Sequence, residues 1–405
     1  MSPNSVSNVA SIRTNDQTQV EKPANVIPFN RPFHVDGEKA HLDQVRQSQS
    51  MGGGGKYYKK CQSWIEDHIQ VGNSIFTHSC THALELAALN IGIQAGDEVI
   101  MPSFTFTSTA NAFALRGGIP VFVDIRSDTL NLDERLIEDA ITSRTRAIVP
   151  VHYAGVSCEM DAITKIASKH GIDVIEDAAH AFLATYRGRM LGSIGNYGTF
   201  SFHETKGIHC GEGGVLLAND KTTHHDLSIL VEKGTNRTQF LNGQVDKYTW
   251  VGLGSSYLAG ELPMAFLYAQ FEQALEATQH RLRIWQQYHE ALKGFEASGV
   301  IRRPIIPNEA THNAHLYYLL LPDVETRNRA LQQLQAMGIG ATFHYVPLHS
   351  SKAGLQFCRA HGDLPKTENL SERLLRLPLW MGMNRSDVSR VIDSLEKVLQ
   401  SLHSS

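Results

Sequence analysis

Several patterns are missing from this sequence of 405 residues. Its five cysteines are odd in number and lack CxxC spacing, which argues against a disulfide framework or a structural zinc site. No apolar run is long enough to cross a bilayer, and no HExxH motif arranges its twenty histidines for a metal. The net charge of −4 comes from interspersed charges of both signs. We therefore expect a soluble, cytoplasmic protein with no metal site, no membrane contact and no nucleic-acid partner.

The composition is that of an ordinary globular protein, 42% apolar and 19% charged, and the length suits two or three domains. The exception is the stretch of residues 1–25, which is rich in Ser, Asn, Thr and Gln and lacks periodicity. Because it has no apolar core preceded by positive charge, it predicts a disordered extension rather than a secretory signal. The run Gly52–Gly55 lacks the spacing of a phosphate-binding Walker loop and predicts a flexible turn.

After Asn73, short apolar runs alternate with helical patterns. This alternation predicts a mostly parallel sheet joined by right-handed crossovers, that is, an α/β fold. The expected strands are Ser74–Thr77, Glu98–Met101, Pro120–Val123, Arg146–Val151, Asp173–Ile175 and Val215–Ala218. The expected helices are Thr81–Asn90, Ser108–Arg116, Asp133–Thr142, Cys158–His170 and Lys221–Lys233. Ligands on such sheets bind beyond the carboxyl ends of the strands.

The pattern changes in the second half of the chain. A loop is expected over 234–256, followed by a long helix from Ala259 past Tyr288. Strands at His315–Leu320 and Ala341–Tyr345, with helices over 327–337 and 386–402, then predict a smaller α+β domain. The predicted division is residues 26–258 for the large α/β domain and 259–405 for the linking helix and small domain.

Two residues at strand ends carry the strongest chemical signal. Lys206 ends the strand-like run Thr199–Lys206 and opens the glycine-rich turn Gly207–Gly214, whereas Asp177 ends an apolar strand that includes Val174 and Ile175. An amine that forms a Schiff base and an acid that keeps a pyridine nitrogen protonated are what pyridoxal phosphate needs. Alone, Lys206 would be a solvated surface lysine and Asp177 a helix-capping acid. Together they favour a pyridoxal phosphate site.

A third signal is the run Thr77–Thr81 ahead of the first strong helix. Backbone N–H groups and a hydroxyl at a helix start can hold a phosphate, although Ser and Thr there are more often simple N-caps. Ser201 could reach the same phosphate or be an ordinary strand serine. Phe106 or Phe104 could stack on a planar cofactor, with a core aromatic as the alternative.

Taken together, these motifs resemble the DegT/DnrJ-type sugar aminotransferases, which bind pyridoxal phosphate and have the fold-type I, aspartate aminotransferase-like architecture. The resemblance runs from Ile27 to about Leu402. It rests on Gly96–Ser103, Val121–Asp124, Glu176–His180, Ser201–His203 and Gly211–Gly214.

The resemblance implies a role for each matched position. Lys206 would form the Schiff base and Asp177 would hold the pyridinium nitrogen. His180 would lie near the phenolic oxygen, and Phe106 would stack on the ring. Three further residues would hold the phosphate, namely Cys80, Thr81 and Ser201. Ser256 would reach the phosphate of a second subunit, which implies a homodimer with shared active sites.

Further segments resemble the members that aminate dTDP-4-keto-6-deoxyglucose with L-glutamate, giving dTDP-4-amino-4,6-dideoxygalactose. They are Val151–Gly155, Phe202–Lys206, Lys233–Arg237, Gly243–Trp250, Gly254–Leu258 and Phe343–His349. One alternative is a relative that acts on another nucleotide-linked keto sugar, such as a 3-keto or GDP-linked 4-keto sugar. Another is a non-catalytic regulator that binds pyridoxal phosphate.

Overall fold

The computed structural model describes residues 26–219 and 227–403. The expected extension over residues 1–25 and the first part of the expected helix Lys221–Lys233 lie outside these ranges. Among the described residues, no helix combines the length and apolar character needed to span a membrane.

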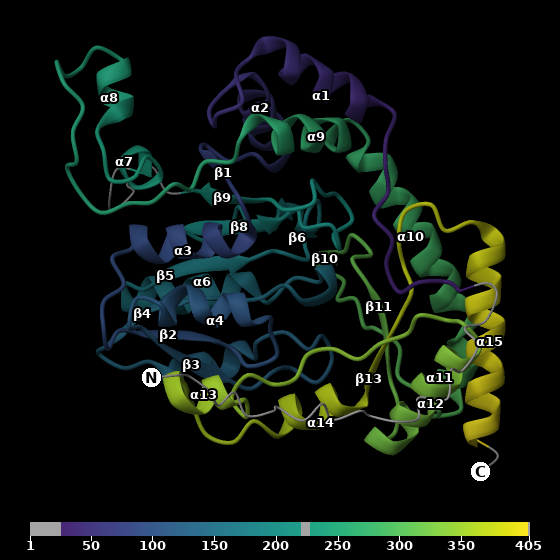
Figure 1. Cartoon of the computed structure of the whole chain (residues 1–405). Helices are drawn as coiled ribbons and strands as arrows, with labels where there is room; N and C mark the ends of the chain where they lie inside the picture. Colours follow the sequence, from purple (N-terminus) through teal and green to yellow (C-terminus); the bar gives the residue numbers. More distant parts are fainter. Residues whose placement is uncertain (1–25, 220–226, 404–405) are drawn as a thin grey trace, which may run out of the picture.

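A sheet of eight strands lies at the centre of the larger part of the chain (Figure 1). Its order is β1-β9-β8-β5-β4-β2-β3-β12, and only β9 runs antiparallel to the rest. The strands are β1 (Ser74–Thr77), β2 (Glu98–Pro102), β3 (Ile119–Val123), β4 (Thr145–Ile148), β5 (Asp173–Asp177), β8 (Tyr197–Ser201), β9 (Gly214–Ala218) and β12 (Arg359–Ala360). The predicted mostly parallel α/β sheet is confirmed.

Side chains alternate between the two faces of this sheet, and each face has its own apolar core. Ile75, Val99 and Leu216 pack with the helices on one face, which are α3 (Cys80–Asn90), α4 (Thr107–Ala114) and α7 (Leu227–Val231). Phe76 and Ile100 pack with those on the other, which are α2 (Lys56–Ile69), α6 (Met160–His170) and α9 (Glu261–Glu272). Because helices cover both faces of the sheet, the sequences of its strands are continuous apolar runs rather than alternating apolar and polar residues.

The remaining elements of this part are short, apart from α1 (Gly37–Ser48), which packs on α9 beside α2 (Figure 1). They are α5 (Ile137–Ala140), β6 (Thr185–Tyr186), β7 (Arg189–Met190) and α8 (Arg237–Leu241). Helix α8 interrupts the segment expected to be a loop. Helix α5 is shorter than the expected Asp133–Thr142, because a 3-10 turn occupies Glu134–Leu136.

The smaller part is built on the antiparallel pair β11 (Tyr317–Leu320) and β13 (Leu374–Leu377). An apolar core joins this pair to α10 (Ala274–Ala291), α12 (Val324–Ala336) and α15 (Arg385–His403). The other elements here are α11 (Lys293–Ala297), β10 (Ala310–Thr311), α13 (Lys352–Phe357) and α14 (Pro365–Arg373).

Two predictions for this half are wrong in detail. The long helix is divided into α9 and α10 at Gln273, whose φ and ψ of −111° and 4° depart from helical values. The expected strand Ala341–Tyr345 does not form; Thr342 makes only an isolated bridge to Arg376. The Phe343 carbonyl, which a neighbouring strand would have used, instead accepts hydrogen bonds from the Arg376 guanidinium.

The division at residue 258 remains a prediction, and two later segments pack against the large sheet. Helix α9 contacts α1 and α2, and β12 pairs in parallel with β3. Asp124, just beyond β3, holds the start of α14 by accepting the backbone N–H groups of Lys366 and Thr367. These contacts hold the smaller part of the chain against the large sheet, near the carboxyl ends of its strands.

Candidate active site

A cavity of about 720 Å³ lies between the ends of β5 and β8 and the smaller part of the chain. Seven of the eight predicted site residues line it, namely Cys80, Thr81, Phe106, Asp177, His180, Ser201 and Lys206. Ser256 does not; it is exposed, and its backbone bridges to Glu232. Because its expected role involves a second subunit, that role stays a prediction.

Lys206 lies in the turn after β8, where its backbone N–H donates to the His203 carbonyl at 2.9 Å. The side chain is partly buried and lines the cavity. Burial lowers the pKa of Lys206 below its usual value, because the charged ammonium loses hydration, and the nearby Arg376 cation adds to this effect. A lysine in this state releases its proton more readily than a surface lysine.

The glycines after Lys206 allow two elements to approach closely. A Cβ on Gly214 would lie 2.3 Å from the Cys80 backbone nitrogen, and one on Gly213 would lie 2.4 Å from the Cys210 sulfur. Such contacts are far shorter than real Cβ atoms show. The start of β9 therefore lies against the N-terminus of α3 only because residue 214 has no side chain.

Asp177 ends β5 and is almost fully buried. Its Oδ2 accepts from the Thr109 hydroxyl at 2.7 Å, and its Oδ1 accepts from the Ala179 N–H at 3.2 Å. Thr105 and Thr109 are themselves joined through their hydroxyls at 2.8 Å. Sequence reasoning missed both threonines, although the hydroxyl-rich run Ser103–Thr109, which leads into the first turn of α4, was a usable signal. The carboxylate is thus oriented before any ligand binds.

The N-terminus of α3 forms another side of the cavity. Ser79 caps it by accepting from the His82 N–H at 3.2 Å, and the Thr81 and Ser108 hydroxyls meet at 2.7 Å. Ser108 lies in the first turn of α4, so two helix starts converge here. Burial raises the pKa of the Cys80 thiol to about 12, which keeps it uncharged. This side therefore offers hydroxyls and helix-terminal N–H groups to an anion.

His180 presents a buried ring with an incomplete set of hydrogen bonds. The ring stacks on His315 with centroids 4.0 Å apart, and its Nε2 lies 3.3 Å from the Tyr345 hydroxyl. Its Nδ1 has no hydrogen-bond partner among the described residues. Burial, together with the Lys206 charge, lowers the pKa of His180 well below its usual value. A neutral imidazole here leaves Nδ1 available to a ligand.

The two candidate phenylalanines differ in exposure. Phe104 is fully buried and packs on Tyr153, with ring centroids 4.9 Å apart. Phe106 is 58% exposed, lines the cavity and lies 6.3 Å from the Tyr345 ring. Of the two, only Phe106 presents its ring to a ligand.

The opposite wall carries cations that sequence reasoning missed. Arg376 of β13 donates to the Phe343 carbonyl at 3.2 and 3.0 Å and lies over the Phe29 ring. Arg281 of α10 donates to backbone carbonyls at 3.2 and 2.6 Å, and burial lowers its pKa to about 10. Among the described residues, neither guanidinium forms an ion pair with a carboxylate. This wall therefore offers positive charge to a ligand.

The comparisons with known proteins agree with this geometry. The model of the DegT/DnrJ/EryC1/StrS aminotransferase family matches residues 34–396. The chain belongs to this family. It is 33% identical over 390 residues to the spore coat polysaccharide biosynthesis protein SpsC of Bacillus subtilis, covering 94% of this chain and 99% of SpsC.

Solved structures of other aminotransferases are similar over nearly the whole chain. TlmJ from Streptoalloteichus hindustanus has a TM-score of 0.85 at 28% identity, covering 94% of this chain and all of TlmJ. The pyridoxal phosphate form of the putative sugar aminotransferase Spr1654 from Streptococcus pneumoniae has a TM-score of 0.85 at 25% identity, covering 93% and 100%. The expected fold-type I architecture is confirmed, and aminotransferases of this family use pyridoxal phosphate.

The cavity suits the cofactor of the DegT/DnrJ/EryC1/StrS aminotransferases. The buried Nδ1 of His180 lacks a partner among the described residues, and the start of α3 offers N–H groups. Asp177 and Lys206 line the same cavity as His180 and the start of α3. No cluster of three or more His, Cys, Asp or Glu side chains suited to a metal occurs within residues 26–219 and 227–403.

Proposed function

We propose that the chain transfers the amino group of L-glutamate to the 4-keto carbon of a dTDP-linked 6-deoxyhexose. The products are 2-oxoglutarate and dTDP-4-amino-4,6-dideoxygalactose. The observation that carries the reaction class is the meeting of Lys206 and Asp177 in one cavity whose sides offer N–H groups and hydroxyls to a phosphate. The choice of sugar is supported by the resemblance of segments such as Val151–Gly155 and Phe343–His349 to members with this substrate.

When bound, pyridoxal phosphate supplies an electron sink for the carbon that loses its proton. The Lys206 amine would hold the cofactor, and it would move a proton to and from the donor α-carbon. Its lowered pKa increases the fraction of neutral amine available as a base near neutral pH. Asp177, oriented by Thr109 and Ala179, keeps the ring nitrogen protonated.

Charge in the cavity suits anionic substrates. Three cationic side chains line it, from Lys206, Arg281 and Arg376, against two carboxylates, from Asp177 and Glu212. Asp177 is held by its own hydrogen bonds and would serve the ring nitrogen. Glutamate carries two carboxylates and a nucleotide sugar carries a diphosphate. We expect the Arg376 guanidinium to bind the α-carboxylate of the amino donor. This carboxylate is bonded directly to the reacting carbon, and arginine binds carboxylates through charge-assisted hydrogen bonds.

We further propose a homodimer with shared active sites. The segment 234–256 exposes several large apolar side chains, namely Phe240, Leu241, Tyr248, Trp250, Val251 and Leu253. In Figure 1, α8 and its flanking loop project away from the sheet. A second copy would cover this surface and bring Ser256 to the neighbouring cavity. Sedimentation of the wild type against a Trp250→Ser, Leu253→Ser variant tests this; a wild-type monomer would contradict it.

Two alternatives use the same cavity. The first is a different nucleotide-linked keto sugar as substrate, either a 3-keto sugar or a GDP-linked 4-keto sugar. A non-catalytic regulator that binds pyridoxal phosphate is the second alternative. The oriented Asp177 and the lowered pKa of Lys206 favour catalysis over this second alternative.

The visible absorption spectrum of the purified protein separates these possibilities. We expect a yellow form that L-glutamate bleaches and dTDP-4-keto-6-deoxyglucose restores. Bleaching without restoration would contradict the sugar and keep the aminotransferase. A yellow form that no amino donor bleaches would support the regulator. With cofactor supplied, the absence of any yellow species would contradict the role of Lys206.

A further inference from the structure

The strand that ends in Asp177 also carries a charged group on its other face. Successive side chains of a strand point to opposite sides, so Asp177 faces the cavity while Glu176 points into the protein. Glu176 is fully buried and does not line the cavity. Burying a carboxylate costs free energy unless hydrogen-bond donors satisfy its oxygens. The donors around Glu176 are therefore the groups that hold this end of β5.

Four donors surround the Glu176 carboxylate. Three are backbone N–H groups of the turn before β8, from Gly192 at 2.9 Å, Ile194 at 2.6 Å and Gly195 at 2.7 Å. The fourth is the His152 ring, whose Nε2 lies 2.9 Å from Glu176 Oε2. His152 is the only side chain in this set, and it comes from the loop after β4.

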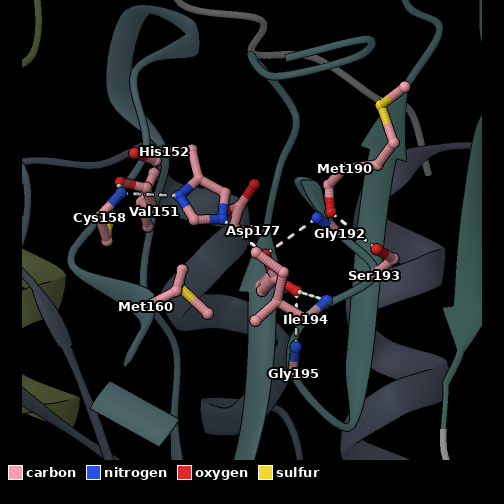
Figure 2. Close-up of polar contacts among 12 residues, drawn as sticks. Val151, His152, Cys158, Met160, Asp177, Met190, Gly192, Ser193, Ile194 and Gly195 are labelled. Carbon is pink, nitrogen blue, oxygen red and sulfur yellow. Dashed lines mark hydrogen bonds and ion pairs between the residues drawn. The ribbon is translucent and has the colours of Figure 1, made fainter. Parts of the chain in front are cut away.

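The neighbours of His152 fix its tautomer. The Cys158 backbone N–H can only donate, and it lies 3.1 Å from His152 Nδ1 (Figure 2). Nδ1 is therefore the acceptor, and the ring proton on Nε2 points at Glu176. His152 is fully buried, so water does not compete for either nitrogen.

The same loop also holds the backbone of Asp177. The His152 N–H donates to the Asp177 carbonyl at 3.1 Å, and the Asp177 N–H donates to the Pro150 carbonyl at 2.9 Å. His152 thus contacts the end of β5 twice, through its backbone at Asp177 and through its ring at Glu176.

We infer that His152 is a positioning residue for Asp177. Through Glu176 it fixes the rotation of the last residues of β5, and this rotation sets the direction of the Asp177 carboxylate in the cavity. The inference rests on the proposed role of Asp177, and it is independent of which sugar the enzyme uses. His152 itself does not line the cavity.

Two substitutions of similar size separate the ring's two contacts. His152→Gln places an amide nitrogen near the position of Nε2 and can still donate to Glu176. His152→Asn reaches the position of Nδ1, so it can still accept from the Cys158 N–H but falls short of Glu176. Both variants are compared with the wild type for pyridoxal phosphate dissociation constant, kcat, KM for L-glutamate and thermal midpoint of the cofactor-free protein.

We expect His152→Asn to weaken cofactor binding and to lower kcat by about tenfold or more, with little change in KM. His152→Gln should restore both quantities to within about threefold of the wild type. Equal losses in the two variants would contradict the inference, as would wild-type behaviour of His152→Asn. If His152→Asn does not fold, His152→Gln decides alone, since a tenfold loss there would overturn the importance of the Glu176 contact.

The role of Asp177 as intermediary is tested in an Asp177→Asn background. There, His152→Asn should add little to the loss of cofactor affinity, because the group that it positions is already gone. A full additional loss would mean that His152 acts only on general stability. If Asp177→Asn alone has the cofactor affinity and kcat of the wild type, the proposed role of Asp177 is contradicted, and the positioning role of His152 is not the cause of that failure.

Discussion

The two walls of the cavity differ in how their polar groups are satisfied. On the large-domain wall, Asp177 is held by Thr109 and Ala179, and Thr81 is paired with Ser108. On the opposite wall, Arg376 contacts a backbone carbonyl and a ring but, among the described residues, no carboxylate. The first wall is set in advance for the cofactor, whereas the second has charge to offer an incoming anion. Variants on the two walls should therefore fail in different ways.

The largest effect should come from Lys206→Ala on the large-domain wall. It removes both the amine that attaches the cofactor and the base that moves the proton, so turnover should fall by about 10⁴-fold or more. Steady-state assay beside the exposed-lysine control Lys59→Ala measures this. Appreciable turnover by the Lys206 variant would contradict the assignment.

Asp177→Asn should lower kcat by about a hundredfold while keeping the fold. The amide oxygen can still accept from the Ala179 N–H, and the amide nitrogen can donate to the Thr109 hydroxyl. A neutral amide cannot, however, stabilise a positive charge on the ring nitrogen. Turnover and thermal midpoint are measured together. An unchanged rate would remove Asp177 from the chemistry, and a collapsed midpoint would show a structural effect instead.

Gly214→Ala should damage the contact between β9 and α3. The added Cβ would lie 2.3 Å from the Cys80 nitrogen, so the free energy of unfolding should fall by about 1–3 kcal/mol. Denaturant unfolding measures this change. Gly294→Ala is the matched control, because a Cβ there meets nothing within 4 Å. Equal stability of the two variants would contradict the close approach.

Arg376→Gln on the small-domain wall should raise KM for L-glutamate by about tenfold with a smaller change in kcat, because a charge-assisted contact to the donor is lost. Initial rates over a range of glutamate concentrations test this, with the exposed Arg385→Gln as control. A fall in kcat at unchanged KM would place Arg376 in the chemistry rather than in binding.

The smallest expected effect couples the two walls. Burial first, and the Arg376 charge in addition, lower the pKa of Lys206, so the neutral amine forms at lower pH than in an exposed lysine. Removing the Arg376 cation should move this titration to higher pH. The rate of acetylation of Lys206 in the cofactor-free protein, followed against pH by peptide mass, measures it. A midpoint that moves down would contradict the sign.

The large-domain wall could be predicted from sequence because its signals are local. Asp177 ends one strand and Lys206 follows another, and Gly213 and Gly214 mark a close approach that the structure explains. The glycine-rich turn indicated the site, but the sequence did not show that the N-terminus of α3 packs against Gly214. The run Thr77–Thr81 was open between a helix N-cap and a phosphate site. The structure shows that Ser79 caps α3 and that Thr81 contacts Ser108 of α4, while the phosphate role stays a prediction.

The small-domain wall could not be predicted in the same way. Arg376 lies within β13 and Arg281 within α10, where an arginine ordinarily indicates a solvated face. Their place in the cavity depends on how the smaller part packs against the sheet, which no local pattern encodes. The wrong strand at Ala341–Tyr345 has the same cause, since its apolar and aromatic residues line the cavity instead of extending a sheet.

The most direct test of the large-domain wall is to locate the lysine that holds the cofactor. The protein is loaded with pyridoxal phosphate, reduced with borohydride so that the cofactor stays fixed to its amine, and mapped by peptide mass spectrometry. The account predicts one modified peptide, with the pyridoxyl group on Lys206. A label on another lysine, or no label on a protein that binds the cofactor, would contradict it.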